Sequence, residues 1–194
     1  MKKMSFQEKW VLLTKYENKP ALTKKNIKSI CVLANDKDAL VRTEAYDSLS
    51  AFPSKHAQKF LKQAIVHEPN ALARSYAILS WADITQALGV HKTQKKFLKQ
   101  LKKLPKIKKS EHCMLSFYYA KYVLWHKKSL KKLLAFLNSS DYQICCCAVN
   151  LLWDIVSPEN RQSIKQALEQ LLQREVCASV SENAAELLQY IKTA

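Results

Sequence analysis

Lysines are the side chains of this sequence best placed to do chemistry, and what they offer is the binding of negative charge. The stretch KTQKKFLKQLKKLPKIKK, residues 92–109, contains nine lysines and no acidic residue. The whole chain has 32 basic and 16 acidic residues, a formal net charge of +16. Such a balance favours nucleic acid, an anionic membrane surface or an acidic protein as a partner. The candidate polyanion-binding residues are Lys92, Lys95, Lys96, Lys99, Lys102, Lys103, Lys106, Lys108 and Lys109.

Large aromatic side chains form a second candidate site. The segment HCMLSFYYAKYVLWH, residues 112–126, is rich in them. Tyr and Trp combine a large apolar ring with a polar atom, and they are common anchors of protein-binding surfaces. The candidate partner-binding residues are Tyr46, Tyr76, Trp81, Tyr118, Tyr122, Trp125 and Trp153. Two interpretations stay open: the rings fill space between helices, or they line a groove for a protein segment. Asp47, Asp83 and Asp154 would favour a segment with positive charge.

Histidines and cysteines form no recognisable catalytic or metal-binding motif. The five histidines are scattered, and His112 and Cys113, although adjacent, point about 100° apart on a helix. The sequence has no C-x-x-C, and the consecutive cysteines 145–147 cannot converge on one ion. One glycine cannot build a phosphate-binding loop. We therefore expect no metal, no cofactor and no catalytic residue, and we favour a protein that is not an enzyme.

The cysteine pattern and the apolar runs also bear on location. Six cysteines lie in apolar, helix-like stretches, which is typical of a reducing cytoplasm. No apolar run approaches the roughly 18 residues of a membrane span, and the N-terminal stretch does not resemble a secretory signal. We expect a cytoplasmic protein without a membrane span.

These side chains must be positioned by helices, because the sequence predicts no other element. Gly89 is the only glycine, hairpin-turn signals are absent, and apolar residues recur at spacings of three and four. The prolines, at positions 20, 53, 69, 105 and 158, fall between amphipathic segments. We predict a single domain over 1–194, with a first helix at 5–17 and five helix pairs. The pairs span about 22–52 (22–34 and 38–52), 54–87 (54–67 and 70–87), 91–126 (91–104 and 110–126), 127–156 (127–138 and 141–156) and 158–193 (158–173 and 177–193).

The second helices of four pairs repeat one pattern. They read DALVRTEAYDSL from Asp38, NALARSYAILSW from Asn70, SEHCMLSFYYAK from Ser110 and DYQICCCAVNLL from Asp141. Each opens with a residue suited to cap a helix N-terminus. Apolar or small residues follow the cap by three and by seven positions, which places them on one helix face. They are Val41, Ala73, Cys113 and Ile144, and then Ala45, Ala77, Phe117 and Ala148. A fifth, weaker copy would begin at Cys177 and place Ala184 in the small position.

This pattern resembles the HEAT-repeat family, on the motifs ALVRTEA and ALARSYA with the preceding Asp38 and Asn70. The resemblance covers nearly the whole chain and implies a right-handed α-solenoid of about five helical hairpins plus an N-terminal helix. It also implies a ladder of Asp38, Arg42 and Arg74 between neighbouring repeats, and a concave face lined by the second helices. The later copies lack the arginine, so the ladder should be incomplete. Some bacterial alkylpurine DNA glycosylases are built from similar repeats, but no catalytic residue can be transferred.

Positive charge is unevenly divided between the two kinds of helix. The predicted first helices carry a net charge of +16 and the second helices −5. The resemblance would place the lysines on the outer, convex face. Within 91–104, Phe97, Leu98, Leu101 and Leu104 form an apolar stripe, so this helix should be packed against its neighbours. The lysines could equally be an ordinary solvated surface.

The predicted function is a non-catalytic helical-repeat scaffold that binds a protein or peptide on the aromatic concave face. The alternative is a nucleic-acid-binding protein that uses the lysine-rich first helices, and that alternative includes a relative of the HEAT-like glycosylases.

Overall fold

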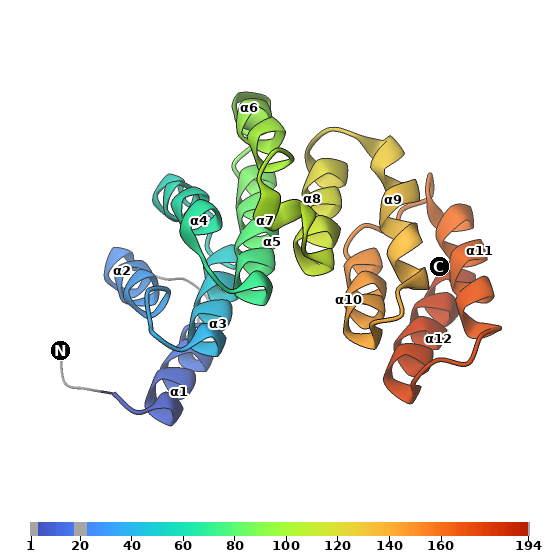
Figure 1. The fold of residues 1–194 in the computed structure, drawn as a ribbon, viewed down its shortest axis with the longest axis horizontal. Coiled ribbons are helices and arrows are strands. Elements are labelled where there is room, and N and C mark those ends of the chain that lie inside the picture. The colour runs from blue at the N-terminus through green and yellow to red at the C-terminus, as the bar shows by residue number, and fades with distance from the viewer. Residues whose placement is uncertain (1–3, 18–22, 194) are drawn as a thin grey trace. The chain divides into compact units, whose positions relative to one another are not determined.

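The computed structural model describes residues 4–17 and 23–193, without the side chains of residues 17 and 91–93. These residues form α-helices and short 3-10 helices, and none of them lies in a β-strand. Figure 1 shows the order of the helices along the chain. The prediction of an all-helical protein is confirmed.

Two compact units follow one another along the chain, residues 1–125 (unit 1) and 126–194 (unit 2). The helices of unit 1 are α1 (Phe6–Glu17), α2 (Lys24–Leu33), α3 (Ala39–Ser50), α4 (Lys55–His67), α5 (Ala71–Ala87), α6 (His91–Leu101), α7 (Pro105–Lys108) and α8 (Glu111–Leu124). Unit 2 contains η1 (Lys127–Ser129), α9 (Leu130–Ala135), η2 (Phe136–Asn138), α10 (Tyr142–Trp153), α11 (Arg161–Leu172) and α12 (Ala178–Thr193). In unit 1, α5 packs against α3, α4 and α8, and in unit 2, α12 packs against α10 and α11.

Side chains at the predicted positions cap the second helices. The Asp38 carboxylate accepts a hydrogen bond from the backbone N–H of Leu40, and the Asn70 side chain accepts one from Ala73. Ser110 and Asp141 cap α8 and α10 in the same way. Each cap satisfies a backbone N–H that has no partner within the helix. The four predicted N-caps are therefore confirmed.

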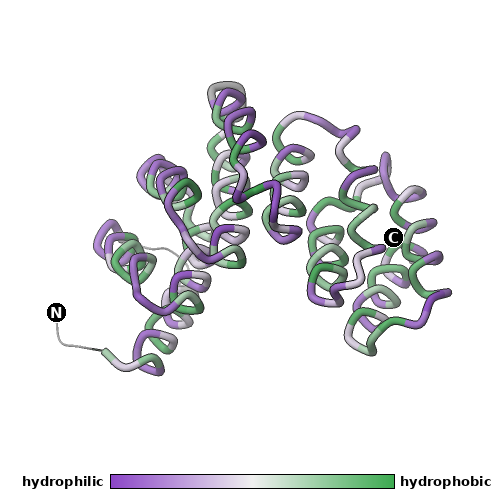
Figure 2. Tube along the Cα trace, viewed as in Figure 1, coloured by the Kyte–Doolittle hydropathy of each residue, from purple (hydrophilic) through white to green (hydrophobic). Residues whose placement is uncertain are grey.

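The predicted core positions are also confirmed. All eight residues that follow the caps by three and seven positions are buried, with at most 3% of each exposed. Small residues such as Ala45 and Ala77 leave room for a neighbouring helix to approach closely. Figure 2 shows hydrophobic and hydrophilic stretches alternating along the helices, as amphipathic packing requires.

Two segments differ from the prediction. Residues 105–109, expected to be a linker, contain the short helix α7, which begins at Pro105. Proline suits a first helical position because its fixed φ is already helical and its missing N–H would have no partner there. Residues 127–138, expected to be one helix, form η1, α9 and η2 in succession. Of the five prolines, Pro20 lies outside the described residues.

Candidate polyanion interface

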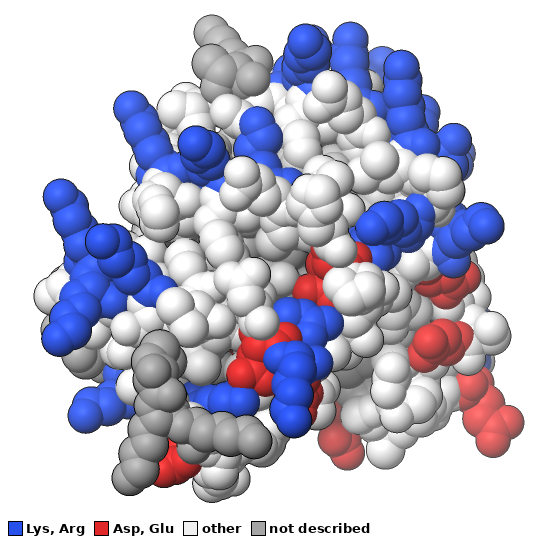
Figure 3. Space-filling model, turned by 60° about the vertical axis from the view of Figure 1, so that its left-hand side comes forward, with Lys and Arg blue, Asp and Glu red and all other residues white. Residues whose placement is uncertain are grey.

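The lysine face of unit 1 is carried by α4, α6 and α7 and by the turns that follow α6 and α7. It consists of Lys55, Lys59, Lys62, Lys95, Lys96, Lys99, Lys102, Lys103, Lys106, Lys108 and Lys109. All of these are exposed except Lys62, which is half-buried. Figure 3 shows basic side chains gathered at the top of the view, on the part of unit 1 where α6 lies. The side chain of Lys92, which the sequence also predicted here, lies outside the described residues.

No acidic side chain offsets this charge among the described residues. The two ion pairs that unit 1 contains there are Lys9–Asp36 and Arg42–Glu68, and neither involves the lysine face. By sequence, unit 1 has 24 basic and 9 acidic residues, a net charge of +15, whereas unit 2 has 8 and 7, a net charge of +1. Nearly all of the excess charge of the chain therefore belongs to unit 1.

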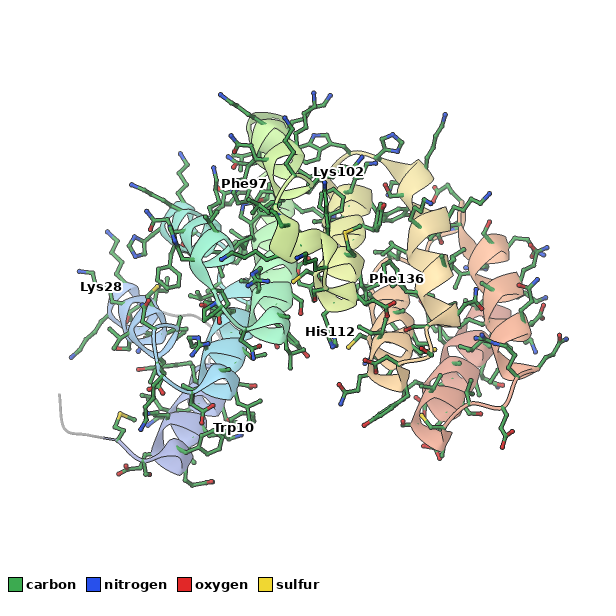
Figure 4. All side chains as sticks on the ribbon, viewed as in Figure 1. Trp10, Lys28, Phe97, Lys102, His112 and Phe136 are labelled. Atoms are coloured by element: carbon green, nitrogen blue, oxygen red, sulfur yellow. The ribbon has the colours of Figure 1, made fainter. Side chains whose placement is uncertain are left out.

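The apolar side of α6 holds its lysines outward. Phe97, Leu98 and Leu101 of α6 are buried in the core, and so is Ile107 of α7. The Phe97 ring packs edge-on against Trp81 of α5, with ring centroids 5.0 Å apart. In Figure 4, Phe97 is labelled on α6, and Lys102 is labelled just beyond the end of that helix. The predicted apolar stripe is present, although Leu104 is only half-buried.

A groove of about 390 Å³ lies between α4 and α6 on the lysine face. It is lined by Gln58, Lys59, Lys62, Gln63, Val66, His67, Gln94 and Phe97. The Lys62 ammonium lies 4.8 Å from the centroid of the Phe97 ring, a cation–π contact between the two helices. Buried Gln58 donates to Thr85 Oγ1 at 2.8 Å and so ties α4 to α5. The groove therefore has cationic and amide walls that are fixed to the core.

Arg74 joins the end of α4 to α7. Arg74 is 3% exposed, and its guanidinium donates to the backbone carbonyls of Glu68, Pro69 and Lys106. The Lys106 ammonium in turn donates to the Val66 carbonyl at 3.0 Å. Positive charge beside the last carbonyls of a helix is favourable because those carbonyls have no partner within the helix. The two lysine-bearing segments are thereby held in one arrangement.

Arg42 and Glu68 form the buried ion pair of unit 1. Arg42 Nε and Nη2 donate to the two Glu68 oxygens at 2.8 and 2.6 Å, and Tyr46 Oη donates to Glu68 Oε2 at 2.9 Å. Burial alone would raise the pKa of the Glu68 carboxyl. The hydrogen bonds from Arg42, from the Asn70 backbone and from Tyr46, together with the Arg42 charge, outweigh burial and lower that pKa. Glu68 therefore remains ionised and fixes α3 to the end of α4.

The predicted ladder of Asp38, Arg42 and Arg74 takes a different form in the structure. Asp38 caps its own helix, Arg42 binds Glu68, and Arg74 binds backbone carbonyls. The acidic partner of Arg42 is Glu68, which no motif in the sequence indicates. It lies 26 residues from Arg42, and no local pattern indicates that pairing.

The predicted aromatic residues differ in how far they are buried. Tyr46, Trp81 and Tyr122 are buried, with at most 4% of each exposed, so they belong to the core and cannot line an open groove. The physical reason is that neighbouring helices cover them, as α6 covers Trp81 through Phe97. The half-buried residues are Tyr76, Tyr118 and Trp125. Trp153, in unit 2, is 37% exposed.

His112 and Cys113 are adjacent in the sequence but differ in exposure. Cys113 is buried and donates to the Ala71 carbonyl at 3.3 Å, and the neighbouring His112, labelled in Figure 4, is half-buried. Among the described residues, no cluster of three or more His, Cys, Asp or Glu side chains could hold a metal ion. Within the same residues, the helices are too short or too polar for any of them to cross a lipid bilayer.

Comparison with known proteins adds no relative to this picture: no protein-family model matches the sequence, and no curated protein matches it.

Proposed function

We propose that unit 1 binds nucleic acid by placing its lysine face along the phosphate backbone. The observation that carries this proposal is the set of eleven lysines on α4, α6 and α7 without an acidic partner among the described residues. Like charges held together on rigid helices repel one another, and a polyanion relieves that repulsion while it releases its own counterions.

A phosphate backbone suits this face better than a lipid surface does. A helix that lies on a membrane inserts its apolar side between the lipids. In α6 that side is already occupied, since Phe97, Leu98 and Leu101 pack into the core of unit 1. Charge alone then remains for the partner, and nucleic acid offers the densest regular array of negative charge.

Binding of this kind would not depend on base sequence. Arginine is the side chain that most often reads bases, because its guanidinium makes two parallel hydrogen bonds to guanine. Both arginines of unit 1, Arg42 and Arg74, are committed to hydrogen bonds within the fold. The lysines that remain contact phosphates as point charges and fix no base.

The architecture we propose is a HEAT-like α-solenoid, with the lysine face on the outer, first helices. The confirmed caps and the buried small residues of the second helices support that arrangement. A scaffold role is favoured over catalysis, and no residue is assigned to a glycosylase reaction. The six candidate aromatic residues of unit 1 give less support to a peptide groove, because three of them are buried.

The test is fluorescence anisotropy of labelled duplex and single-stranded DNA with the full-length chain, at about 50 and 200 mM salt. Each phosphate contact should weaken duplex binding roughly 3.5-fold over that range. The test variant replaces Lys95, Lys96, Lys99 and Lys103, all of which are exposed, with Gln. If all four lysines touch phosphates, the loss of affinity between about 50 and 200 mM salt should be roughly 100-fold smaller for this variant than for the unmodified chain.

A matched control replaces four exposed lysines of unit 2, Lys127, Lys128, Lys131 and Lys132, with Gln. This variant has the same net charge as the test variant, so it should bind DNA much more tightly if the lysine face is the site. Equal weakening in both variants would mean that the attraction follows total charge only, and it would overturn the proposal. Absence of DNA binding by the unmodified chain would do the same.

A further inference from the structure

One face of unit 2 carries exposed aromatic and amide side chains along the seam between two helices. We call it the α10–α12 face, and it consists of Tyr142, Cys146, Asn150 and Trp153 from α10 and Asn183, Glu186 and Tyr190 from α12. Across the seam, Asn183 of α12 contacts Cys146 and Asn150 of α10, and further along both helices Tyr190 contacts Trp153. The seam is therefore a continuous strip within unit 2.

Aromatic rings at one end of the strip are open to solvent. Trp153 is 37% exposed and Tyr190 is 46% exposed, and their ring centroids lie 5.2 Å apart with an interplanar angle of 41°. Large rings gain free energy when they leave water, so a paired and exposed set is a ready anchor for a partner. The ring faces also attract cations.

The middle of the strip offers polar groups to an extended backbone. Asn183 Nδ2 donates to Asn150 Oδ1 at 3.3 Å and lies 3.4 Å from Cys146 Sγ. This arrangement leaves the Asn150 amide nitrogen as a donor and the Asn183 amide oxygen as an acceptor. A peptide backbone presents the matching carbonyl and N–H groups.

Acidic residues neighbour the aromatic pair at the ends of both helices. Asp154 follows Trp153 at the C-terminal end of α10, and Glu186 lies one turn before Tyr190 on α12, whereas Lys192, two positions after Tyr190, points to another side of that helix. Among the described residues, the ion pair in unit 2 is Lys165–Glu169, so neither carboxylate has a cationic partner there. Burial raises the pKa of Asp154, which means that its charged form is partly deprived of water and would gain from a nearby cation. Four lysines of unit 2 lie instead on η1 and α9.

The length of the strip sets the size of its ligand. Tyr142 is 57% exposed and precedes Trp153 by eleven residues, which is close to three full helical turns. The two side chains therefore lie on the same side of α10, about 16 Å apart along its axis. An extended chain rises about 3.3 Å per residue, so about five residues would reach from one ring to the other.

We propose that the α10–α12 face binds an extended, lysine- or arginine-containing protein segment of about five residues. A cationic side chain stacks on the Trp153–Tyr190 pair beside Asp154 and Glu186, and the two asparagines contact the backbone of the segment. This site is independent of the lysine face, because it lies in the other unit and takes a partner of opposite charge.

The test titrates a fluorescein-labelled peptide, KAKAKAK, with the full-length chain and follows anisotropy at about 50 mM salt. The neutral peptide QAQAQAQ measures background. Since unit 1 is strongly cationic, a basic peptide has little reason to bind there. Trp153→Ala should weaken KAKAKAK binding roughly two- to fivefold through loss of the stacked cation, and D154N/E186Q should weaken it by a similar factor or more. Equal binding of the two peptides would overturn the proposal.

Trp10→Ala is the matched control. Trp10 is also 37% exposed and stacks on a second ring, Phe6 at 5.8 Å, but it belongs to α1 of unit 1. It should leave KAKAKAK binding unchanged. A second measurement avoids substitutions in the tested chain: the indole N–H signal of Trp153, assigned with Trp153→Phe, should shift as KAKAKAK is added. A shift confined to Trp10, or equal weakening by Trp10→Ala, would refute this site.

Discussion

Glu68→Gln should strongly destabilise unit 1. Glu68 has 1% of its side chain exposed, and it accepts hydrogen bonds from Arg42, from Tyr46 and from the Asn70 backbone. Gln has nearly the same shape, so the change removes charge without opening a cavity. One of its two oxygens becomes an NH₂ group, which can no longer accept from donors that all point toward it.

The size of the effect follows from the Arg42 charge that remains without its partner. The Arg42 side chain is 12% exposed, and its guanidinium would lose its counterion while staying in place. Removing one partner of a buried ion pair costs about 3 to 5 kcal/mol, because the remaining charge is neither paired nor hydrated. We expect about 3 kcal/mol for Glu68→Gln, since one acceptor oxygen remains. An exposed pair such as Lys165–Glu169, at 3.9 Å, should contribute less than about 1 kcal/mol, which sets the scale for comparison.

The assay is urea unfolding followed by tryptophan fluorescence in a Trp153→Phe background. The three remaining tryptophans, Trp10, Trp81 and Trp125, all belong to unit 1, so the signal reports on that unit. Glu68→Gln should lower the midpoint without changing the slope of free energy against urea. If Glu68→Gln costs less than about 1 kcal/mol, the size expected of an exposed pair, the ion pair does not hold α3 to α4 as the structure implies.

Low pH should reduce the difference in free energy of unfolding between the unmodified chain and Glu68→Gln. The pKa of Glu68 is lowered in the folded chain, from an ordinary value of 4.5. A lowered folded pKa gives stability that is fully present above the unfolded value and is lost as pH falls through the folded one. The free-energy gap between the unmodified chain and Glu68→Gln should therefore be constant near pH 7 and shrink below about pH 4.5. A gap that does not change with pH would refute the electrostatic explanation.

Two further predictions concern a thiol and a helix cap. Cys177 is exposed, and hydrogen bonds from Ser179 and the backbone of Val180 lower its pKa, whereas burial raises the pKa of Cys31 to about 11. Mass spectrometry after brief iodoacetamide treatment at pH 8 should find Cys177 alkylated before Cys31, and the reverse order would contradict this ranking. Asn70→Ala removes the cap of α5 and should cost about 1 kcal/mol in the urea assay. A neutral effect would mean that the cap is not needed there.

Local signals in the sequence predicted the helices well. Asp38, Asn70, Ser110 and Asp141 are caps because their short polar side chains can reach the first free N–H groups, and such a preference can be read from a few residues. The buried positions behind each cap follow from helical spacing alone. Both kinds of signal act within a few turns, and both predictions are confirmed.

Contacts between distant helices could not be read in the same way. Helical spacing shows that Trp81 and Tyr122 lie on a face of α5 or α8, but not which other helix covers that face. In the structure, Phe97 of α6 packs on Trp81, and so a residue predicted at a surface is buried. The pairing of Arg42 with Glu68 could not be predicted for the same reason, because it depends on how the end of α4 packs beside α3.

Arginines and lysines occupy different places in unit 1. Arg42 and Arg74 lie inside unit 1, where a guanidinium can satisfy several acceptors at once, and lysines supply the exposed charge. That division separates two tasks: the arginines hold α4 and α7 in place, and the lysines on those helices stay available. A lysine at position 74 would present one compact ammonium instead of a fork, and it could not reach the Glu68, Pro69 and Lys106 carbonyls together. The rigidity of the lysine face thus depends on residues that never touch a partner.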